Sequence, residues 1–278
     1  MITIARRLSR GVNGIIGLSL LGVVLILVVL DLTGVGLKDV LAQNSSLSFH
    51  SPTSHNIFGT DQFGRDIMSR SVAGLVNSLR IGLIAVAIAS VIGTTLGIIG
   101  GFVGGIVDDA IGRMSDLLFA CPAVLLALAI VSALGPGSFN TAIAIAIVYI
   151  PIFIRVARGP VLSLREREFV KAASLLGFSK WRVMRHHILP NLAAPVIVQI
   201  SLSLSWAVLT ESGLSFLGLG TQPPNPSLGL MVSEAQAFAA TAWWTLLFPS
   251  VFIVLLVVTF NMLGDGLRDA LDPSWNRE

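Results

Sequence analysis

The stretch LLFACPAVLLALAIVSALGPGSFNTAIAIAIVYIPIFI, residues 117–154, runs for 38 residues without an Asp, Glu, Lys or Arg. A helix needs about 20 apolar residues to cross the hydrocarbon core of a bilayer, so this stretch is long enough for two crossings. Gly135, Pro136 and Gly137 lie near its middle, and residues of these types end helices. The stretch therefore predicts two membrane helices joined by a tight turn.

Four further runs lack charged side chains and are long enough to cross a bilayer. They cover residues 11–30, 81–107, 188–210 and 235–264. Only helices and closed barrels satisfy the backbone inside lipid, and these runs do not alternate as barrel strands do. Only 12% of the residues are charged, whereas a soluble domain has about 25%. The sequence therefore predicts an all-α membrane protein with six transmembrane helices and no soluble domain.

The positive charges are distributed unevenly between the two sides of this predicted bundle. If the amino terminus lies inside, 14 of the 18 Lys and Arg side chains fall in inside segments. The four in outside segments are Lys38, Arg65, Arg70 and Arg80. Because cytoplasmic loops carry the excess of Lys and Arg, we expect the amino and carboxyl termini to be cytoplasmic. The pI near 9.6 then reflects topology and does not indicate nucleic-acid binding.

The first apolar run has features of a signal peptide, because Arg6, Arg7 and Arg10 precede it and the sequence VLA at 40–42 resembles a cleavage site. The run is longer than the 7–15 apolar residues of a signal peptide, and the candidate cleavage site lies well beyond it. We therefore expect this helix to be retained as an anchor. The single cysteine, Cys121, permits no internal disulfide.

Residues 163–191, SLREREFVKAASLLGFSKWRVMRHHILPN, form a basic island between the fourth and fifth predicted helices. Ser163 and Glu166 match a capping box, which marks a helix start. Gly177 suits the residue after a helix, where the backbone takes a positive φ. Ser179 can cap a second short helix that ends before Pro190. We therefore expect a helix, a glycine turn and a second helix in this loop.

Gly93, Gly97, Gly101 and Gly105 recur every four residues along the second predicted helix. Small residues on one face let helices approach closely where no hydrophobic effect drives their association. We expect tight packing inside the bundle, and a sliding surface along a pathway is the alternative.

Ionisable residues in two outside positions are candidates for function. Asp61, Arg65 and Asp66 either pair locally and organise the segment or face a partner. Glu211 lies at the outer end of the fifth helix, and ionisable residues near membrane depth are functional candidates; capping of the following turn is the alternative. Between these positions, apolar residues from 67 to 79 follow a helical period and predict an amphipathic helix in the interface.

Nothing in the sequence indicates catalysis or metal binding. The four histidines are His50, His55, His186 and His187. Adjacent histidines on a helix point about 100° apart, so His186 and His187 are poor joint ligands. The motifs G-x-x-x-x-G-K-[ST] and H-E-x-x-H are absent, as is G-x-S-x-G with a plausible triad. We expect no catalytic residue, metal or cofactor in this chain.

The basic island contains A-A-x-x-x-G (Ala172, Ala173, Gly177), followed by Leu189 and Pro190. Other notable segments are FGTDQFGRDIMSR (58–70), GGFVGGIVDDAIGRMSDLLFACP (100–122), LSFLGLGTQPPNPSLG (214–229) and FNMLGDGLRDALDP (260–273). Together these segments resemble the C-type permease subunit of the dipeptide, oligopeptide and nickel class of ABC importers. The island is similar to the EAA loop of such permeases, and the resemblance covers the chain from about residue 55 to its end.

The resemblance implies a type I ABC importer permease fold in the prokaryotic cytoplasmic membrane, forming half of a pathway for di- or oligopeptides. It also implies a homologous second permease subunit, two ATPase subunits that bind ATP and Mg, and an external substrate-binding protein. The residues expected to couple to the ATPases are Glu168, Lys171, Ala172, Ala173, Gly177, Leu189 and Pro190. Asp61, Arg65 and Asp66 become candidates for docking of the binding protein, and Glu211 becomes a candidate for the pathway.

One position departs from the family pattern. The glutamate that opens the family motif, two residues after the aromatic, is Lys171 in this chain. Glu168 lies nearly one helical turn earlier and can serve a similar electrostatic purpose. A salt bridge made by the family glutamate therefore does not carry over directly.

The predicted organisation has four parts. They are residues 1–34 (amino-terminal tail and first helix), 35–78 (external segment with the interfacial helix), 79–267 (core ABC transmembrane domain with five helices and a coupling loop at 158–191) and 268–278 (cytoplasmic tail). Two alternatives stay open, namely an ion-coupled secondary transporter and the same ABC architecture carrying nickel or another small solute. A secondary transporter needs ionisable residues or broken helices at the bilayer midplane, and the apolar runs offer few such charges.

Overall fold

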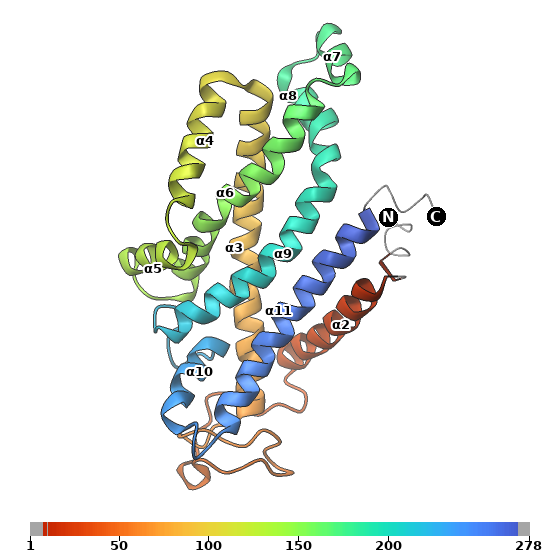
Figure 1. Cartoon of the computed structure of the whole chain (residues 1–278). Helices are drawn as coiled ribbons and strands as arrows, with labels where there is room; N and C mark the ends of the chain where they lie inside the picture. The colour runs from red at the N-terminus through yellow and green to blue at the C-terminus, as the bar shows by residue number, and fades with distance from the viewer. Residues whose placement is uncertain (1–7, 10, 272–278) are drawn as a thin grey trace.

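A computed structural model describes residues 8, 9 and 11–271. Within these residues the secondary structure consists of helices joined by loops, with one isolated β-bridge between Thr60 and Asp66. The elements in chain order are α2 (Val12–Thr33), η1 (Ser45–Leu47), α3 (Ile67–Val103), α4 (Gly105–Phe119), α5 (Ala123–Leu134), α6 (Ser138–Leu164), α7 (Glu168–Leu175), α8 (Lys180–Val183), η2 (Met184–Ile188), α9 (Leu189–Phe216), α10 (Leu228–Ala235), η3 (Gln236–Phe238) and α11 (Trp244–Leu271). Figure 1 shows a bundle of long helices with α7 and α8 at one end and α10 at the other. We call these the α7 end and the α10 end.

Five helices within the described residues are long and apolar enough to cross a membrane: α2, α3, α6, the continuous helix Lys180–Phe216, and α11. The pair α4 and α5 passes the same test together but is bent by 92° at the break between them. The spans therefore number five, or six if the bent pair is one span. The predicted all-α membrane class is confirmed, and the third of the six predicted helices corresponds to the bent pair.

The breaks between helices have two different causes. Gly135 and Gly137 flank the turn between α5 and α6 with φ of 90° and 141°, which glycine adopts without steric cost. That predicted break is confirmed. Pro122 takes an extended backbone before α5, with φ −55° and ψ 130°, and a proline cannot continue the preceding helical ladder. The run 117–154 did not predict this second break, because its hydropathy is continuous there.

Helix α3 extends well beyond the thickness of a membrane core. Its 37 residues give a length of about 55 Å at 1.5 Å per residue, against about 30 Å for the hydrocarbon core. Ile67, Val72 and Leu75 are buried at its start, and Ile67 packs in a cluster with Met231 and Trp244. The predicted interfacial helix is therefore corrected, because these residues belong to α3 and face protein.

The glycine stripe packs α3 against α6. A Cβ atom added at Gly93 would lie 2.6 Å from the carbonyl oxygen of Ile150, and one added at Gly97 would lie 2.6 Å from that of Ile154. Gly101 faces Val161 in the same way, whereas Gly105 begins α4 with open space around it. The predicted tight packing is confirmed for the first three glycines.

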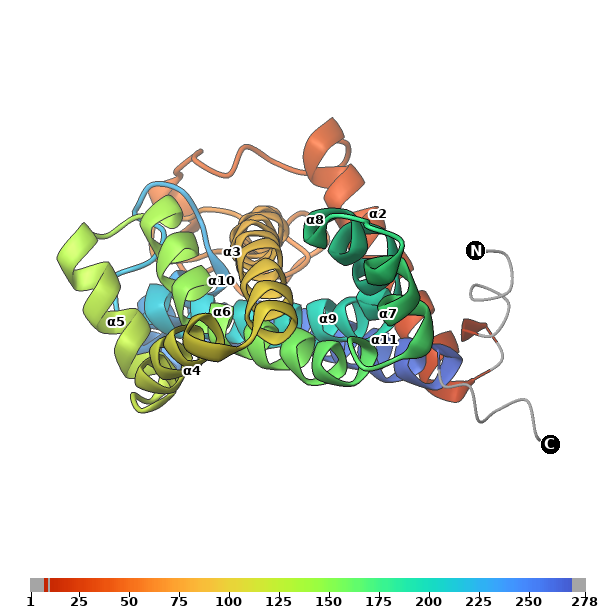
Figure 2. The same cartoon turned by 90° about the horizontal axis from the view of Figure 1, so that it is seen from above.

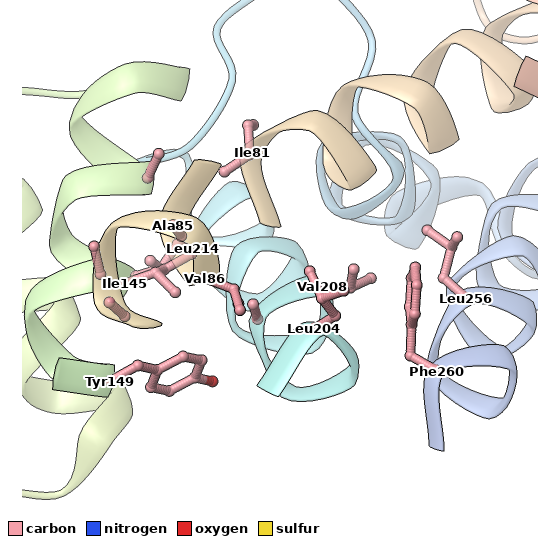
Figure 3. Close-up of a cluster of buried hydrophobic side chains, with 14 of the residues drawn as sticks. Ile81, Ala85, Val86, Ile145, Tyr149, Leu204, Val208, Leu214, Leu256 and Phe260 are labelled. Atoms are coloured by element: carbon pink, nitrogen blue, oxygen red, sulfur yellow. The ribbon is translucent and has the colours of Figure 1, made fainter. Parts of the chain in front are cut away.

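The main core lies where α3, α6, α9 and α11 meet, as Figure 3 shows. The buried side chains labelled there include Ile81, Ala85, Val86, Ile145, Leu204, Val208, Leu256 and Phe260. The Tyr149 hydroxyl and Thr210 Oγ1 are hydrogen bonded across this core at 2.9 Å. Helix α2 packs chiefly against α11 at the edge of the bundle (Figures 1 and 2), where a Cβ atom on Gly17 would collide with the backbone of Leu263.

Candidate functional site

The basic island forms a small helical element at the α7 end of the bundle (Figure 1). Helix α7 ends in a turn where Gly177 has φ of 81°. The Phe178 N–H donates to the Ala173 carbonyl at 3.2 Å, which is the six-to-one hydrogen bond of a Schellman motif. The Ser179 hydroxyl then accepts from the Arg182 N–H and caps α8. The predicted helix, glycine turn and capped second helix are confirmed.

The predicted capping box at the start of this island is wrong. Ser163 lies in the last turn of α6, which ends at Leu164. Glu166 instead forms an ion pair with Lys171, with Nζ and Oε2 3.0 Å apart. Lys171 lowers the pKa of the Glu166 carboxyl by donating a hydrogen bond to it. The pattern misled because the apolar face of α6 continues past the boundary that a capping box would mark.

This ion pair bears on the unusual lysine of the motif. Glu168 is the first residue of α7 and forms no ion pair with a described basic residue. Glu166, which the motif analysis did not select, is the carboxylate that pairs with Lys171. The sequence signal available for it was its spacing of five residues from the lysine. Local charge balance in the island therefore involves Glu166 and Lys171, both largely exposed.

The two alanines of the motif have different surroundings. Ala173 is buried in a cluster with Val170, Ile188 and Ala157, whereas Ala172 is exposed. One face of α7 thus packs against the end of the bundle. The other face and the following turn expose Leu175 and Leu176, which are 88% and 76% accessible. The element consequently combines a fixed inner face with an uncovered apolar outer one.

The connection from this element into the membrane is a continuous helix. Met184–Ile188 form a π-helix, in which the Leu189 N–H bonds to the Met184 carbonyl. Pro190 then occupies the first turn of α9, directly after the π-helix. The expectation that the second helix ends before Pro190 is therefore corrected. Leu189 and Pro190 are exposed at the junction.

Ion pairs at the same end also hold α4 and the end of α6. The Arg158 guanidinium binds Asp108 in a bidentate geometry, with distances of 2.5 and 2.7 Å. Arg165 donates to the Gly101 carbonyl at 3.0 Å. These contacts were not predicted, because nothing in the sequence indicates which inner-loop charges meet. They join α4 and the end of α3 to the end of α6, just before α7.

Asp61, Arg65 and Asp66 lie together at the α10 end, before α3. Arg65 Nε is 2.6 Å from Asp61 Oδ2. Asp66 caps α3 by accepting from the Ser69 N–H at 2.9 Å. The local pairing that sequence analysis considered is therefore present, and the question of docking is left to experiment.

Arg70 and Glu234 extend the pair of Asp61 and Arg65. Arg70, 1% accessible, lies 3.7 Å from Asp61 and 3.9 Å from Glu234, which also pairs with Arg65 at 3.3 Å. Glu234 belongs to α10, so the cluster ties α10 to the start of α3. The sequence signal for Arg70 was its position one turn after the Asp66 cap. Glu234 had no such signal, because it lies far away in the chain.

Glu211 is fully buried near the outer part of α9. Its Oε1 accepts a hydrogen bond from Ser215 Oγ at 2.6 Å, and Ser215 Oγ accepts in turn from the Thr221 N–H. Oε2 has no hydrogen-bond partner among the described residues. In this conformation the side chain faces packed protein and organises the turn after α9.

The described residues contain no group of three or more His, Cys, Asp or Glu side chains suited to a metal ion. His186 instead contacts the Arg182 carbonyl through Nδ1, at 3.1 Å. The geometry therefore describes a multi-pass helical membrane protein with an exposed helical element at one end.

Comparison with solved structures identifies this arrangement as the fold of ABC importer permeases. A chain from inward-facing crystals of the MetNI methionine ABC transporter has a TM-score of 0.61 at 16% identity, covering 74% of this chain and 98% of that one. A chain of an amino acid ABC transporter with histidines has a TM-score of 0.56 at 15% identity, covering 72% and 94%. At these identities the likeness concerns the fold alone.

The family follows from the sequence. The model of the binding-protein-dependent transport system inner membrane component family matches residues 93–277, and the chain belongs to this family. It is 47% identical over 230 residues to the dipeptide transport system permease protein DppC of Alkalihalophilus pseudofirmus, covering 83% of this chain and 76% of the relative. It is also 47% identical over 224 residues to the glutathione transport system permease protein GsiD of Salmonella typhimurium (81% and 74%), and 40% identical over 274 residues to a putative peptide transport permease of Brucella abortus (99% and 92%).

Membership of the family defines the role of the chain. It is a multi-pass inner-membrane permease subunit of a binding-protein-dependent ABC importer, and its function is transport and not catalysis. The family carries no cofactor of its own, because the ATPases are separate subunits. The predicted ABC permease family is therefore confirmed.

Proposed function

We propose that this chain forms half of the membrane pathway of an importer for short peptides, with a homologous second permease as the other half. Relatives at 40–47% identity are named for dipeptides, di- and tripeptides, D,D-dipeptides and glutathione. These solutes share a short peptide-like backbone. Two ATPase subunits and an external substrate-binding protein complete the assembly.

The observation that carries the proposal is the uncovered apolar surface on a basic element at the α7 end. Leu175 and Leu176 are almost fully exposed beside the Gly177 turn. A short loop outside the membrane core gains nothing from exposing two leucines to water, since burying one stabilises by about 1.5–3 kcal/mol. An ATPase subunit that covers them accounts for their exposure, and Glu168, Lys171 and Ala172 lie on the same element.

The orientation follows from the charges. The α7 end carries Lys171, Lys180, Arg182 and Arg185, and the excess of positive charge favours the cytoplasmic side. Both termini then lie in the cytoplasm, as in the type I importer arrangement. We propose that the chain divides into four parts at residues 34, 78 and 267, with 158–191 as the coupling loop. Residues 67–78 belong to α3.

At the α10 end, Asp61, Arg65 and Asp66 support a surface for the binding protein. The ion pairs of Arg65 with Asp61 and with Glu234 of α10 give that surface a fixed shape. Their contribution is to hold neighbouring residues in place, since Arg65 and Asp66 are themselves buried. Glu211, buried in α9 and hydrogen bonded to Ser215, is the residue that we propose for the pathway.

The proposal is tested by purifying the tagged chain gently from native membranes and assaying the recovered complex in liposomes. We expect a second permease and ATPase subunits in the eluate, and ATP-dependent uptake of a labelled dipeptide when the binding protein is added. Uptake that depends on an ion gradient and not on ATP would contradict it. An intact ATP-driven complex that takes up nickel but not dipeptides would overturn the substrate assignment alone.

A further inference from the structure

A cavity of about 210 Å³ lies between α3 and the helix that leads from the α7 end into the membrane. Ile98 and Ile99 of α3, together with Thr94 and Thr95 one turn earlier, form one wall, and Met184 and Leu189 form the other. Trp181 and Arg185 lie at its rim. The cavity is distinct from the apolar surface of Leu175 and Leu176, neither of which lines it.

The sequence indicates how deep in the membrane this cavity lies. Ile98 and Ile99 precede the end of α3 at Val103 by four or five residues, or about 6–8 Å at 1.5 Å per residue. We infer that they lie in the hydrocarbon core near its boundary at the α7 end, because they belong to the uncharged run 81–107. Trp181, 62% accessible, belongs to a residue type enriched at that boundary. The cavity thus spans the junction between hydrocarbon and headgroups.

The charge at the rim has one sign. Arg185 forms no ion pair with a described carboxylate, and no described acidic residue lines the cavity. Lys180 and Arg182 lie within five residues of Arg185, on the same short helical stretch, and they also lack ion pairs with described carboxylates. A basic rim above an apolar floor between membrane helices is the arrangement that receives an anionic lipid headgroup and its chain.

We propose that this cavity binds an anionic phospholipid, with Arg185 contacting the phosphate and an acyl chain lying between α3 and α9. Arginine suits the phosphate because its guanidinium donates two parallel hydrogen bonds. An acyl chain fills the apolar floor, which a free phosphate would leave empty. The lipid would hold the π-helix Met184–Ile188 against α3 at the root of the α7 element. The proposal does not depend on which solute the importer carries.

The test uses the complete complex in phosphatidylcholine nanodiscs that contain a small fraction of phosphatidylglycerol. Native mass spectrometry counts the phosphatidylglycerol molecules that the complex retains. For Arg185→Gln we expect an approximately fivefold lower apparent affinity, since one surface cation contributes that much to binding of anionic lipid. Arg185→Lys keeps the charge but not the two parallel hydrogen bonds, so its affinity should lie between those of the wild type and Arg185→Gln. Ile99→Trp fills the floor and should lower retention as strongly as Arg185→Gln.

Arg167→Gln is the matched control, because Arg167 is exposed at the same end but does not line the cavity. Its affinity for phosphatidylglycerol should equal that of the wild type. Equal losses in Arg167→Gln and Arg185→Gln would show diffuse charge attraction and overturn the site. Unchanged retention in Arg185→Gln would overturn it as well, whether or not Ile99→Trp assembles. If inorganic phosphate competes as effectively as the lipid, the occupant is a free anion and the lipid proposal is overturned.

Discussion

The two ends of this permease are built in opposite ways. At the α10 end, polar and charged side chains are turned inward and satisfied by one another, with Arg70 almost inaccessible between Asp61 and Glu234. At the α7 end, leucines are turned outward and one glycine turn sets the shape of the element. Exposed apolar side chains such as Leu217 occur at the α10 end as well, but there ion pairs between α3 and α10 fix the shape, whereas at the α7 end Leu175 and Leu176 are exposed beside the glycine turn itself. We propose from this difference that the α10 end is preformed and that the α7 end is completed on assembly.

The strongest test of the preformed end is Arg70→Ala. Removing this guanidinium leaves Arg65 as the one described cation within 4 Å of both Asp61 and Glu234, and breaking a buried ion pair costs up to about 3–5 kcal/mol. We expect that loss in the free energy of unfolding, measured by denaturant in detergent. Arg113→Ala, at an exposed position in α4, should change it by less than about 0.5 kcal/mol. Similar losses of unfolding free energy in Arg70→Ala and Arg113→Ala would contradict the contrast between the two ends.

The next effect concerns the glycine turn. Gly177→Val places a β-branched residue at φ of 81°, which costs about 1–3 kcal/mol. We expect transport to fall at least tenfold while membrane insertion is unchanged, because the strain is confined to the α7 element. Gly159→Val is the control, since Gly159 also has open space around it but lies in helical backbone. Normal uptake by a well-expressed Gly177→Val variant would show that the turn geometry is dispensable.

A third variant separates assembly from stability. Leu176→Ser should leave the unfolding free energy of the isolated chain nearly unchanged, because the side chain is exposed. It should weaken ATPase binding at least tenfold, since a buried leucine contributes about 1.5–3 kcal/mol. Leu217→Ser, exposed near the α10 end, serves as the comparison in a titration of ATPase against the permeases in nanodiscs. Equal ATPase affinities would mean that the exposed leucines are not covered by that subunit.

The smallest expected effect belongs to the exposed pair of Glu166 and Lys171. The folded pKa of Glu166 is lowered by Lys171, so the pair stabilises the element above the unfolded pKa of about 4.3. That contribution is lost as the pH falls through the folded pKa. Glu166→Gln should therefore speed hydrogen exchange in α7 slightly near neutral pH and make no difference in strong acid. A larger difference in acid than at neutral pH would reverse the sign and refute the assignment.

The sequence predicted what depends on continuous patterns along the chain. The apolar runs specified the membrane class, and Gly93, Gly97 and Gly177 were assigned their packing and turn roles from spacing and conformational freedom alone. What it missed depends on contacts between distant segments. The apolar run is continuous through Pro122, so its hydropathy does not reveal the 92° bend between α4 and α5.

The site was predictable to a similar extent. The predicted glycine turn and capped second helix are present, but the capping box failed because local pattern cannot reveal that α6 continues through Ser163. Glu234 meets Arg65 across 169 residues of chain, a separation over which one sequence carries no pairing signal. Ala172 is exposed and Ala173 is buried, and this difference likewise depends on how α7 packs against the bundle.

The central claim is that the α7 element is completed by an ATPase subunit, and photo-cross-linking in native membranes tests it most directly. A benzophenone amino acid replaces Leu176 in one variant and Leu217 in the other, both exposed but at opposite ends. We predict an adduct with an ATPase subunit from position 176 and none from position 217. Absence of an ATPase adduct at position 176 in a complex that still transports would contradict the account.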